Sequence, residues 1–192
     1  MKAPLTVIVA MWISVSTFGQ NNQSVIKLAL MAAPDELKEG ASVYKISPKG
    51  ELIVIRQGTN DLVCLADDTE QKGLNVSCYH KELEPFMARG RALKLEGKSF
   101  QEIFDIREKE TKEGKLKMPR QPSALYVYTA QDGQFNSSTG DVTKGYLRYV
   151  IYIPYATAET TGLPLAPSAP GMPWIMDPGT HRAHIMINPP QN

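Results

Sequence analysis

The sequence predicts an α+β domain, in which an antiparallel sheet packs against helices segregated along the chain. Short apolar runs separated by turn residues between positions 42 and 66 are typical of strands. Almost half of the charged residues lie between 80 and 120, in patterns typical of solvated helices. More than half of the aromatic residues follow position 121, in Tyr-, Val- and Ile-rich runs that favour strands. The 192 residues suffice for one core of ordinary size.

The N-terminus predicts a secretory signal peptide over residues 1–19. A basic residue, Lys2, precedes an apolar run over 5–15, and small or polar residues follow. This order is typical of signal peptides, and the run is shorter than the roughly 20 residues that a membrane-spanning helix needs. We therefore expect cleavage between Gly19 and Gln20, a secreted or periplasmic protein, and no membrane span in the mature chain.

The mature chain is expected to be a single domain over 20–192 with no net charge. The full sequence carries a net charge of +1, and cleavage would remove Lys2. A neutral chain without a basic patch has no electrostatic attraction for nucleic acid, so nucleic acid is excluded as an expected partner.

Before the first cysteine, the sequence predicts a helix, a further helical turn and a meander of three strands. The expected helical segments are 24–33 and 34–39, and the expected strands are 42–46, 51–57 and 62–66. Ser47-Pro48-Lys49-Gly50 has the composition of a type I turn between the first two strands. The second strand contains four consecutive apolar residues, which predicts a central strand covered on both faces.

The only two cysteines are Cys64 and Cys78, and export predicts that they form a disulfide. Two buried thiols or half of a metal site are the alternatives. Their spacing matches no zinc signature, and the nearest histidine, His80, has no second histidine beside it. If the disulfide forms, the chain has no cysteine nucleophile.

Beyond the cysteines, the sequence predicts two helices and then further strands. Pro85 suits the first turn of one helix, and Ser99 with Glu102 forms the capping-box pattern that begins the next. The expected strands are 124–130, 145–153 and 183–187. Residues 154–178 are rich in proline and predict an irregular excursion over the surface.

Three stretches of the chain carry a family resemblance. In 32–43, Ala-Ala-Pro precedes Gly-Ala-Ser-Val; in 56–65, a Gly-Thr-Asn turn precedes a cysteine; and 178–186 runs from Pro-Gly to His-Ile-Met. Together they resemble a family of uncharacterised exported bacterial proteins, which contain a domain of unknown function. The resemblance implies export and a bridge between the two cysteines, and it implies no activity or catalytic residue.

Asp177, His181 and His184 form the most chemically suggestive segment, because imidazole and carboxylate groups suit zinc, copper or iron. Positions 181 and 184 would point to opposite faces of a strand, so both could bind one metal only if His181 lies in a turn. The alternative is one surface histidine and one histidine packed beside the sheet.

Five aromatic residues predict a ligand-binding surface. Tyr126 and Tyr128 share one strand face, Tyr149 and Tyr155 share another, and Trp174 lies in the Pro-rich excursion. Such stripes can stack on sugars, although tyrosines in strands are more often half-buried structural residues.

The sequence contains none of the usual catalytic signatures, including a nucleophile elbow, a zinc-protease helix and a phosphate-binding loop. It therefore predicts an exported, non-enzymatic domain that binds a small molecule, a glycan or an envelope component, without a cofactor. The alternative is a small metal-dependent or hydrolytic enzyme that uses Asp177, His181 and His184, with a bound metal.

Overall fold

The computed structural model describes residues 17–67, 72–137 and 139–190. Its helices and turns of 3-10 helix are α1 (Thr17–Ala29), η1 (Leu30–Ala32), α2 (Asp35–Lys38), η2 (Lys81–Leu83), α3 (Glu84–Leu95), α4 (Phe100–Lys112) and α5 (Ala158–Thr161). Its strands are β1 (Ser42–Ile46), β2 (Leu52–Arg56), β3 (Leu62–Leu65), β4 (Leu74–His80), β5 (Ser123–Ala130), β6 (Phe135–Asn136), β7 (Asp141–Val142), β8 (Tyr146–Tyr152), β9 (Trp174–Met176) and β10 (His184–Ile187). The α+β class is confirmed.

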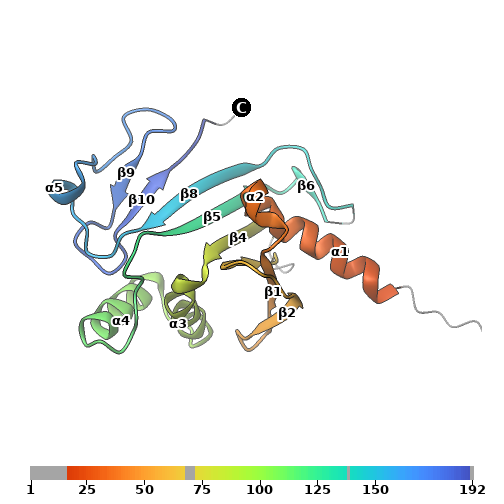
Figure 1. The fold of residues 1–192 in the computed structure, drawn as a ribbon, viewed down its shortest axis with the longest axis horizontal. Coiled ribbons are helices and arrows are strands. Elements are labelled where there is room, and N and C mark those ends of the chain that lie inside the picture. Colours follow the sequence, from red (N-terminus) through yellow and green to blue (C-terminus); the bar gives the residue numbers. More distant parts are fainter. Residues whose placement is uncertain (1–16, 68–71, 138, 191–192) are drawn as a thin grey trace, which may run out of the picture.

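Eight strands form one twisted sheet in the order β2-β1-β3-β4-β5-β8-β10-β9 (Figure 1). Its ladders are antiparallel, apart from the parallel pair formed by β1 and β3. The strands β6 and β7 form a small separate hairpin in the loop between β5 and β8. The prediction of a mostly antiparallel sheet is therefore correct.

The predicted three-stranded meander is wrong, because β3 pairs with β1 and leaves β2 at the edge of the sheet. The turn after β2 explains this order. The backbone N–H groups of Thr59 and Asn60 both donate to the carbonyl of Gly40, at 2.8 and 2.9 Å. A Cβ at Gly58 would lie 2.3 Å from that same oxygen, so the turn packs directly on the chain that enters β1. This contact carries the chain across to the other side of β1.

The prediction that the second strand is central and covered on both faces is also wrong, because β2 is an edge strand on which Ile53 and Val54 are exposed. Two other local predictions are confirmed. The turn Ser47–Gly50 has the expected bond from the N–H of Gly50 to the carbonyl of Ser47, with Gly50 at a φ of 78°. Ser99 and Glu102 form both bonds of a capping box at the start of α4. The strand β4, which includes Cys78, was not predicted, although Leu74, Val76 and Cys78 alternate with polar residues as in a half-buried strand.

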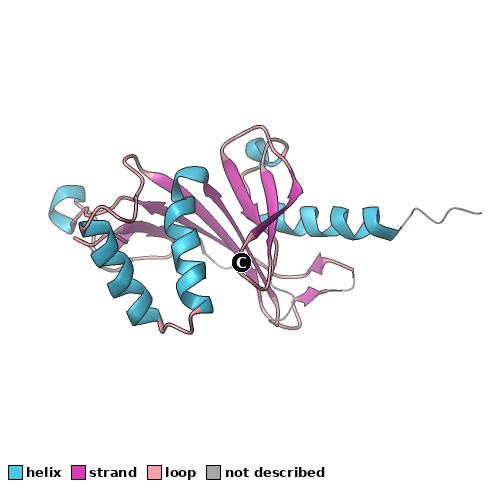
Figure 2. Ribbon diagram, turned by 90° about the horizontal axis from the view of Figure 1, so that it is seen from below, coloured by secondary structure: helices cyan, strands magenta, loops and turns pink. Residues whose placement is uncertain are grey.

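The helices α3 and α4 lie together on one face of the sheet, and α1 lies against the other (Figures 1 and 2). We call these the α3/α4 face and the α1 face. The core on the α3/α4 face is built from Tyr79, Leu83, Phe86, Leu116, Val150 and Tyr152. The core on the α1 face is built from Ala29, Ala32, Ala33, Ala41, Val43, Leu62, Cys64, Leu74, Val76, Cys78 and Ala130. The sheet thus packs an apolar cluster on each of its two faces.

A disulfide joins Cys64 on β3 to Cys78 on β4, two residues that are direct partners in the register. Both side chains are fully buried in the core on the α1 face. The sequence prediction of this bridge is confirmed, and it fastens the two central strands on which the α1 face is built.

Most of the predicted signal peptide lies outside the described residues. Residues 17–19 begin α1, so the expected cleavage site between Gly19 and Gln20 falls within the first turn of that helix. Within the described ranges, no helix is both long enough and apolar enough to span a bilayer.

The Pro-rich excursion over 154–178 is mostly irregular, as predicted, but it contains two regular elements. Thr157 caps the short helix α5, and Gly162 ends it in a left-handed conformation. Residues 174–176 form β9, the second edge of the main sheet. We did not predict this strand, because three residues after a proline give too weak a pattern.

Candidate functional site

The three predicted metal-binding residues lie on one hairpin, formed by β9 and β10. Asp177 follows β9 with a φ of 49°, His181 lies in the turn, and His184 begins β10. The turn position that a shared metal would need for His181 is therefore present. Both histidines are buried, with exposed fractions of 0% and 2%.

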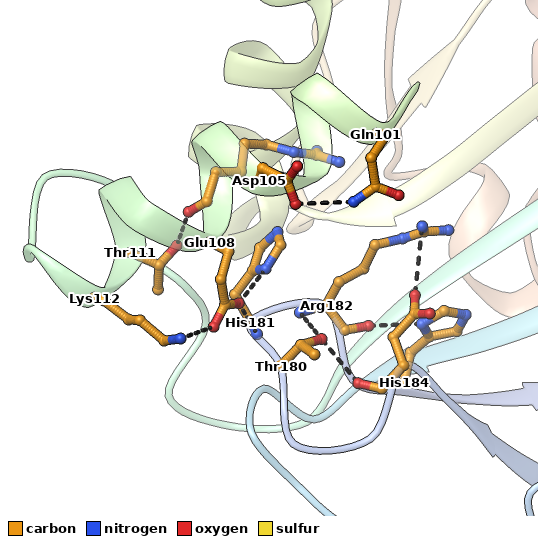
Figure 3. Close-up of polar contacts among 11 residues, drawn as sticks. Gln101, Asp105, Glu108, Thr111, Lys112, Thr180, His181, Arg182 and His184 are labelled. Atoms are coloured by element: carbon orange, nitrogen blue, oxygen red, sulfur yellow. Dashed lines mark hydrogen bonds and ion pairs between the residues drawn. The ribbon is translucent and has the colours of Figure 1, made fainter. Parts of the chain in front are cut away.

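His181 is held by Glu108 of α4, which is 73 residues away in the sequence (Figure 3). The backbone N–H of His181 donates to Glu108 Oε2 at 2.7 Å, and His181 Nδ1 lies 2.6 Å from the same oxygen. Lys112 Nζ lies 2.8 Å from the other carboxylate oxygen. The rings of Phe86 and Phe104 contact the imidazole edge-on, with centroids 5.8 and 5.0 Å away. This network fixes α4 to the β9–β10 turn.

The two groups of this pair have pKa values that favour a neutral histidine and a carboxylate. Burial lowers the pKa of His181, and the bond to Glu108 offsets this effect only in part. Burial alone would raise the pKa of Glu108, but its bonds to Lys112 and His181 outweigh burial and lower it. Neutral imidazole that donates through Nδ1 leaves Nε2 as the lone-pair nitrogen, and this atom is buried without a hydrogen-bond partner.

The other two members of the predicted metal set have different partners. His184 Nδ1 lies 2.7 Å from the carbonyl of Arg182, and its ring lies 5.3 Å from that of Tyr152. Asp177 pairs with the guanidinium of Arg182 at 3.4 Å. Within the described part of the chain, no group of three or more His, Cys, Asp or Glu side chains is arranged to hold a metal ion.

Arg107 places a buried positive charge in the same region, and it forms no ion pair with any of the residues that the structure describes. Its side chain is 8% exposed, and its guanidinium carbon lies 3.9 Å from the centroid of the Phe86 ring. Nη1 donates to the Phe86 carbonyl at 3.3 Å, and burial lowers the pKa of Arg107 to about 10. A Cβ at Gly90 would lie 3.0 Å from Nη1 of Arg107. The absence of a side chain at Gly90 therefore makes room for the guanidinium against α3. The contacts of Arg107 hold α4 against α3.

The five predicted ligand-binding aromatics do not form one surface. Tyr126 and Tyr149 are direct cross-strand partners with ring centroids 6.1 Å apart, and Tyr128 lies on the same face. Trp174 pairs with Met186, which pairs with Val150, so Trp174 lies on the opposite face of the sheet.

The prediction that Tyr149 and Tyr155 share a strand face is wrong. The strand β8 ends at Tyr152, and Pro154 cannot continue a ladder. Tyr155 therefore lies in a turn with a φ of 63°, and its side chain is 41% exposed.

A cleft of about 930 Å³ opens where β3 begins, β4 ends and β5 begins. The segment that follows α4 forms one wall of this cleft, and the end of α2 contributes Leu37. Its apolar lining includes Leu62, Leu116, Ala124 and Tyr126, and its polar lining includes His80, Glu82, Lys117 and Arg120. Of the predicted site residues, only Tyr126 lines this cleft.

The cleft has a cationic side. Lys117 and Arg120 are exposed, and neither has an ion-pair partner among the described residues. Glu82 is the acidic residue of the lining, and the ion pair of its neighbour Lys81 is formed with Asp61, at 2.8 Å. Burial raises the pKa of Tyr126, with smaller contributions from Glu36 and Tyr149, so its hydroxyl stays neutral. The cleft thus combines an apolar wall with two cations, Lys117 and Arg120, and one carboxylate, Glu82.

No protein-family model, no curated protein and no solved structure matches this chain.

Sequence reasoning missed most of the cleft and most of the buried network. Lys117 and Arg120 belong to a charged stretch that resembles any solvated segment. The pairing of Glu108 with His181 joins residues too far apart in sequence for any spacing rule. Arg107 did carry a signal, because it continues the apolar spacing of Ile103 and Phe104 along α4.

Proposed function

We propose that this protein is an exported binding domain whose ligand occupies the cleft at the ends of β3 and β4. The observation that carries this proposal is the cleft itself. It combines an apolar wall with Tyr126 and with two cations that have no ion-pair partner in the described part of the chain. Its volume of about 930 Å³ lies within the range of small-molecule sites. The predicted signal peptide and the Cys64–Cys78 disulfide support an oxidising compartment outside the cytoplasm.

The chemistry of the lining favours an amphiphilic anion, which is the kind of molecule that a cell envelope supplies. An acyl chain would cover the side chains of Leu62, Leu116 and Ala124, which line the cleft together. A carboxylate or phosphate head would lie beside Lys117 and Arg120. A neutral glycan would leave both of these cations without a partner.

Calorimetric titration of the exported protein with dodecanoate tests this proposal, and a dodecyl ammonium ion serves as the matched ligand. We expect binding of the anion and none of the cation. The Arg120→Glu variant should weaken dodecanoate binding about tenfold, which corresponds to a loss of roughly 1.4 kcal/mol of binding free energy. Arg120 is exposed, so this substitution leaves the core intact.

Lys144→Glu is the matched control variant, because Lys144 is exposed and lies outside the cleft. It should bind dodecanoate as the unmodified protein does. Absence of dodecanoate binding, or equal weakening by both charge reversals, would contradict the proposed site.

A metal-dependent enzyme is the second candidate, and the free Nε2 of His181 is the observation that favours it. A carboxylate bound to Nδ1 orients a histidine in many metal and catalytic sites. Metal analysis of the dialysed protein, alone and as the His181→Ala/His184→Ala variant, separates the two candidates. Near-stoichiometric metal that the variant loses would support the enzyme, whereas the binding domain predicts no metal in either. The complete burial of His181 favours the binding domain.

A further inference from the structure

The two edges of the eight-stranded sheet differ in how they are protected. The edge strand β9 has three residues, follows Pro173 and belongs to the Pro-rich excursion, and such features discourage pairing with another chain. The edge strand β2 has five residues, and Leu52–Ile55 contains neither a proline nor a charge. Among the described strands, only β1 pairs with β2, so one side of its backbone faces no ladder.

The side chains of the β2 edge are unusually exposed for their size. Ile53 is 42% exposed and Val54 is 53% exposed, on opposite faces of the strand. Ile46 of β1 shares the face of Val54 and is 44% exposed. Leu95, at the end of α3, is 55% exposed, and a Cβ at Gly50 would lie 2.5 Å from its Cδ1. Ile46, Val54 and Leu95 thus form an apolar patch that borders the open edge.

The register of the β1–β2 hairpin shows which backbone groups face outward. The N–H of Ser47 donates to the carbonyl of Glu51. Hydrogen-bonded pairs alternate along an antiparallel ladder, so the next such pair is Lys45 with Ile53. The backbone groups of Leu52 and Val54 therefore point away from β1. Two outward N–H and two outward C=O groups, two residues apart, form a template for one more antiparallel strand.

We infer that the β2 edge binds the β2 edge of a second copy of this chain, in an antiparallel pairing about a two-fold axis at Ile53. In this register Leu52 of one copy lies opposite Val54 of the other, on both sides of the axis. These are the residues whose backbone groups point outward, and their side chains share the face of the apolar patch. The pairing is isologous and closes as a dimer with one continuous sheet.

Charge favours a second copy in this orientation. Glu51 immediately precedes β2 and Arg56 ends it, and neither has an ion-pair partner among the described residues. The guanidinium of Arg56 donates instead to the carbonyls of Lys38 and Ala41. In this antiparallel register Glu51 lies opposite Ile55 of the second copy, one residue from its Arg56. A parallel pairing would place like charges opposite each other, which is unfavourable.

Sedimentation of the exported protein over a wide concentration range tests the inference. We expect a dimer at high concentration, with a monomer–dimer equilibrium on dilution. The Val54→Lys and Leu52→Glu variants should each be monomeric at concentrations where the unmodified protein dimerises, because each places two charges in the apolar pairing. Both side chains lie on an edge strand, and circular dichroism would establish that the fold is kept.

Mixing the two variants tests the register itself. In a mixed pair, the lysine of one chain lies opposite the glutamate of the other, so dimers should reappear in the mixture. The control variant Leu165→Lys, at a residue that is 63% exposed in the Pro-rich excursion, should dimerise like the unmodified protein. A protein that is monomeric at every concentration would overturn the inference and leave the edge to a strand of another polypeptide. A dimer that Val54→Lys does not weaken would also overturn it.

Discussion

Individual buried side chains connect elements that the chain forms far apart. Glu108 is the clearest case, because its carboxylate accepts from two N–H groups of His181 and from Lys112. The first two donors are buried and have no access to water, whereas Lys112 is largely exposed. The three bonds therefore differ in what their loss would cost.

We predict that Glu108→Ala lowers the free energy of unfolding by about 2 kcal/mol, since it leaves two buried donors without an acceptor. Lys112→Ala should lower it by less than about 0.5 kcal/mol, as expected for an exposed ion pair. Urea denaturation of both variants measures the difference. Equal losses would show that the buried bonds of His181 contribute nothing beyond the surface pair.

At the scale of elements, the strands β3 and β4 are held together by both a ladder and a disulfide. Cys64 and Cys78 are direct partners in the ladder. The disulfide closes a loop between two residues whose sequence separation is 14. The strands carry cores on both faces, so their pairing supports both clusters.

We predict that the Cys64→Ser/Cys78→Ser variant is less stable than the oxidised protein by about 3 kcal/mol, the entropy of closing a loop of this length in the unfolded chain. Urea denaturation with and without a thiol reductant is the measurement. The reductant should destabilise the unmodified protein and leave the variant unchanged. If the reductant acts equally on both, the disulfide is not the source of the stability.

The capping box of α4 is a second prediction at this scale. Ser99 accepts from the N–H of Glu102 at 3.3 Å, and the Glu102 carboxylate accepts from the N–H of Ser99 at 2.8 Å. Ser99→Ala should lower the unfolding free energy by about 1 kcal/mol, whereas Ser99→Asp, which can still cap, should cost much less. Thermal unfolding of the two variants separates loss of the cap from loss of the serine itself.

For the whole molecule, the two buried histidines predict how stability depends on pH. Burial lowers the pKa of both His181 and His184, while a histidine in the unfolded chain titrates near about 6.5. Below that value the unfolded chain binds protons that the folded protein does not. Their contribution is therefore complete above about pH 6.5 and falls as the pH drops below it.

We expect the unfolding free energy to fall between about pH 7.5 and about pH 5.5, and to fall by less in His184→Asn. His80→Asn is the control, because His80 lies at the surface and is partly exposed. Urea denaturation at the two pH values measures each change. If the unfolding free energy of His184→Asn falls as much as that of the unmodified protein, the pH dependence comes from other groups.

The sequence by itself determined the α+β class, the disulfide, the hairpin turn at Ser47–Gly50 and the cap at Ser99. These features depend on composition or on residues within a few positions of one another, which local physics can specify. It also predicts export and a ligand, which stay predictions.

The tertiary structure alone decided the strand order, the cleft and the partners of the histidines. The meander prediction failed because the turn at Gly58 packs on Gly40, a contact that no local pattern encodes. The cleft joins Leu62 to Arg120, and the histidine network joins Glu108 to His181. Such sites require segments distant in sequence to meet, and only packing of the two cores on the shared sheet brings them together.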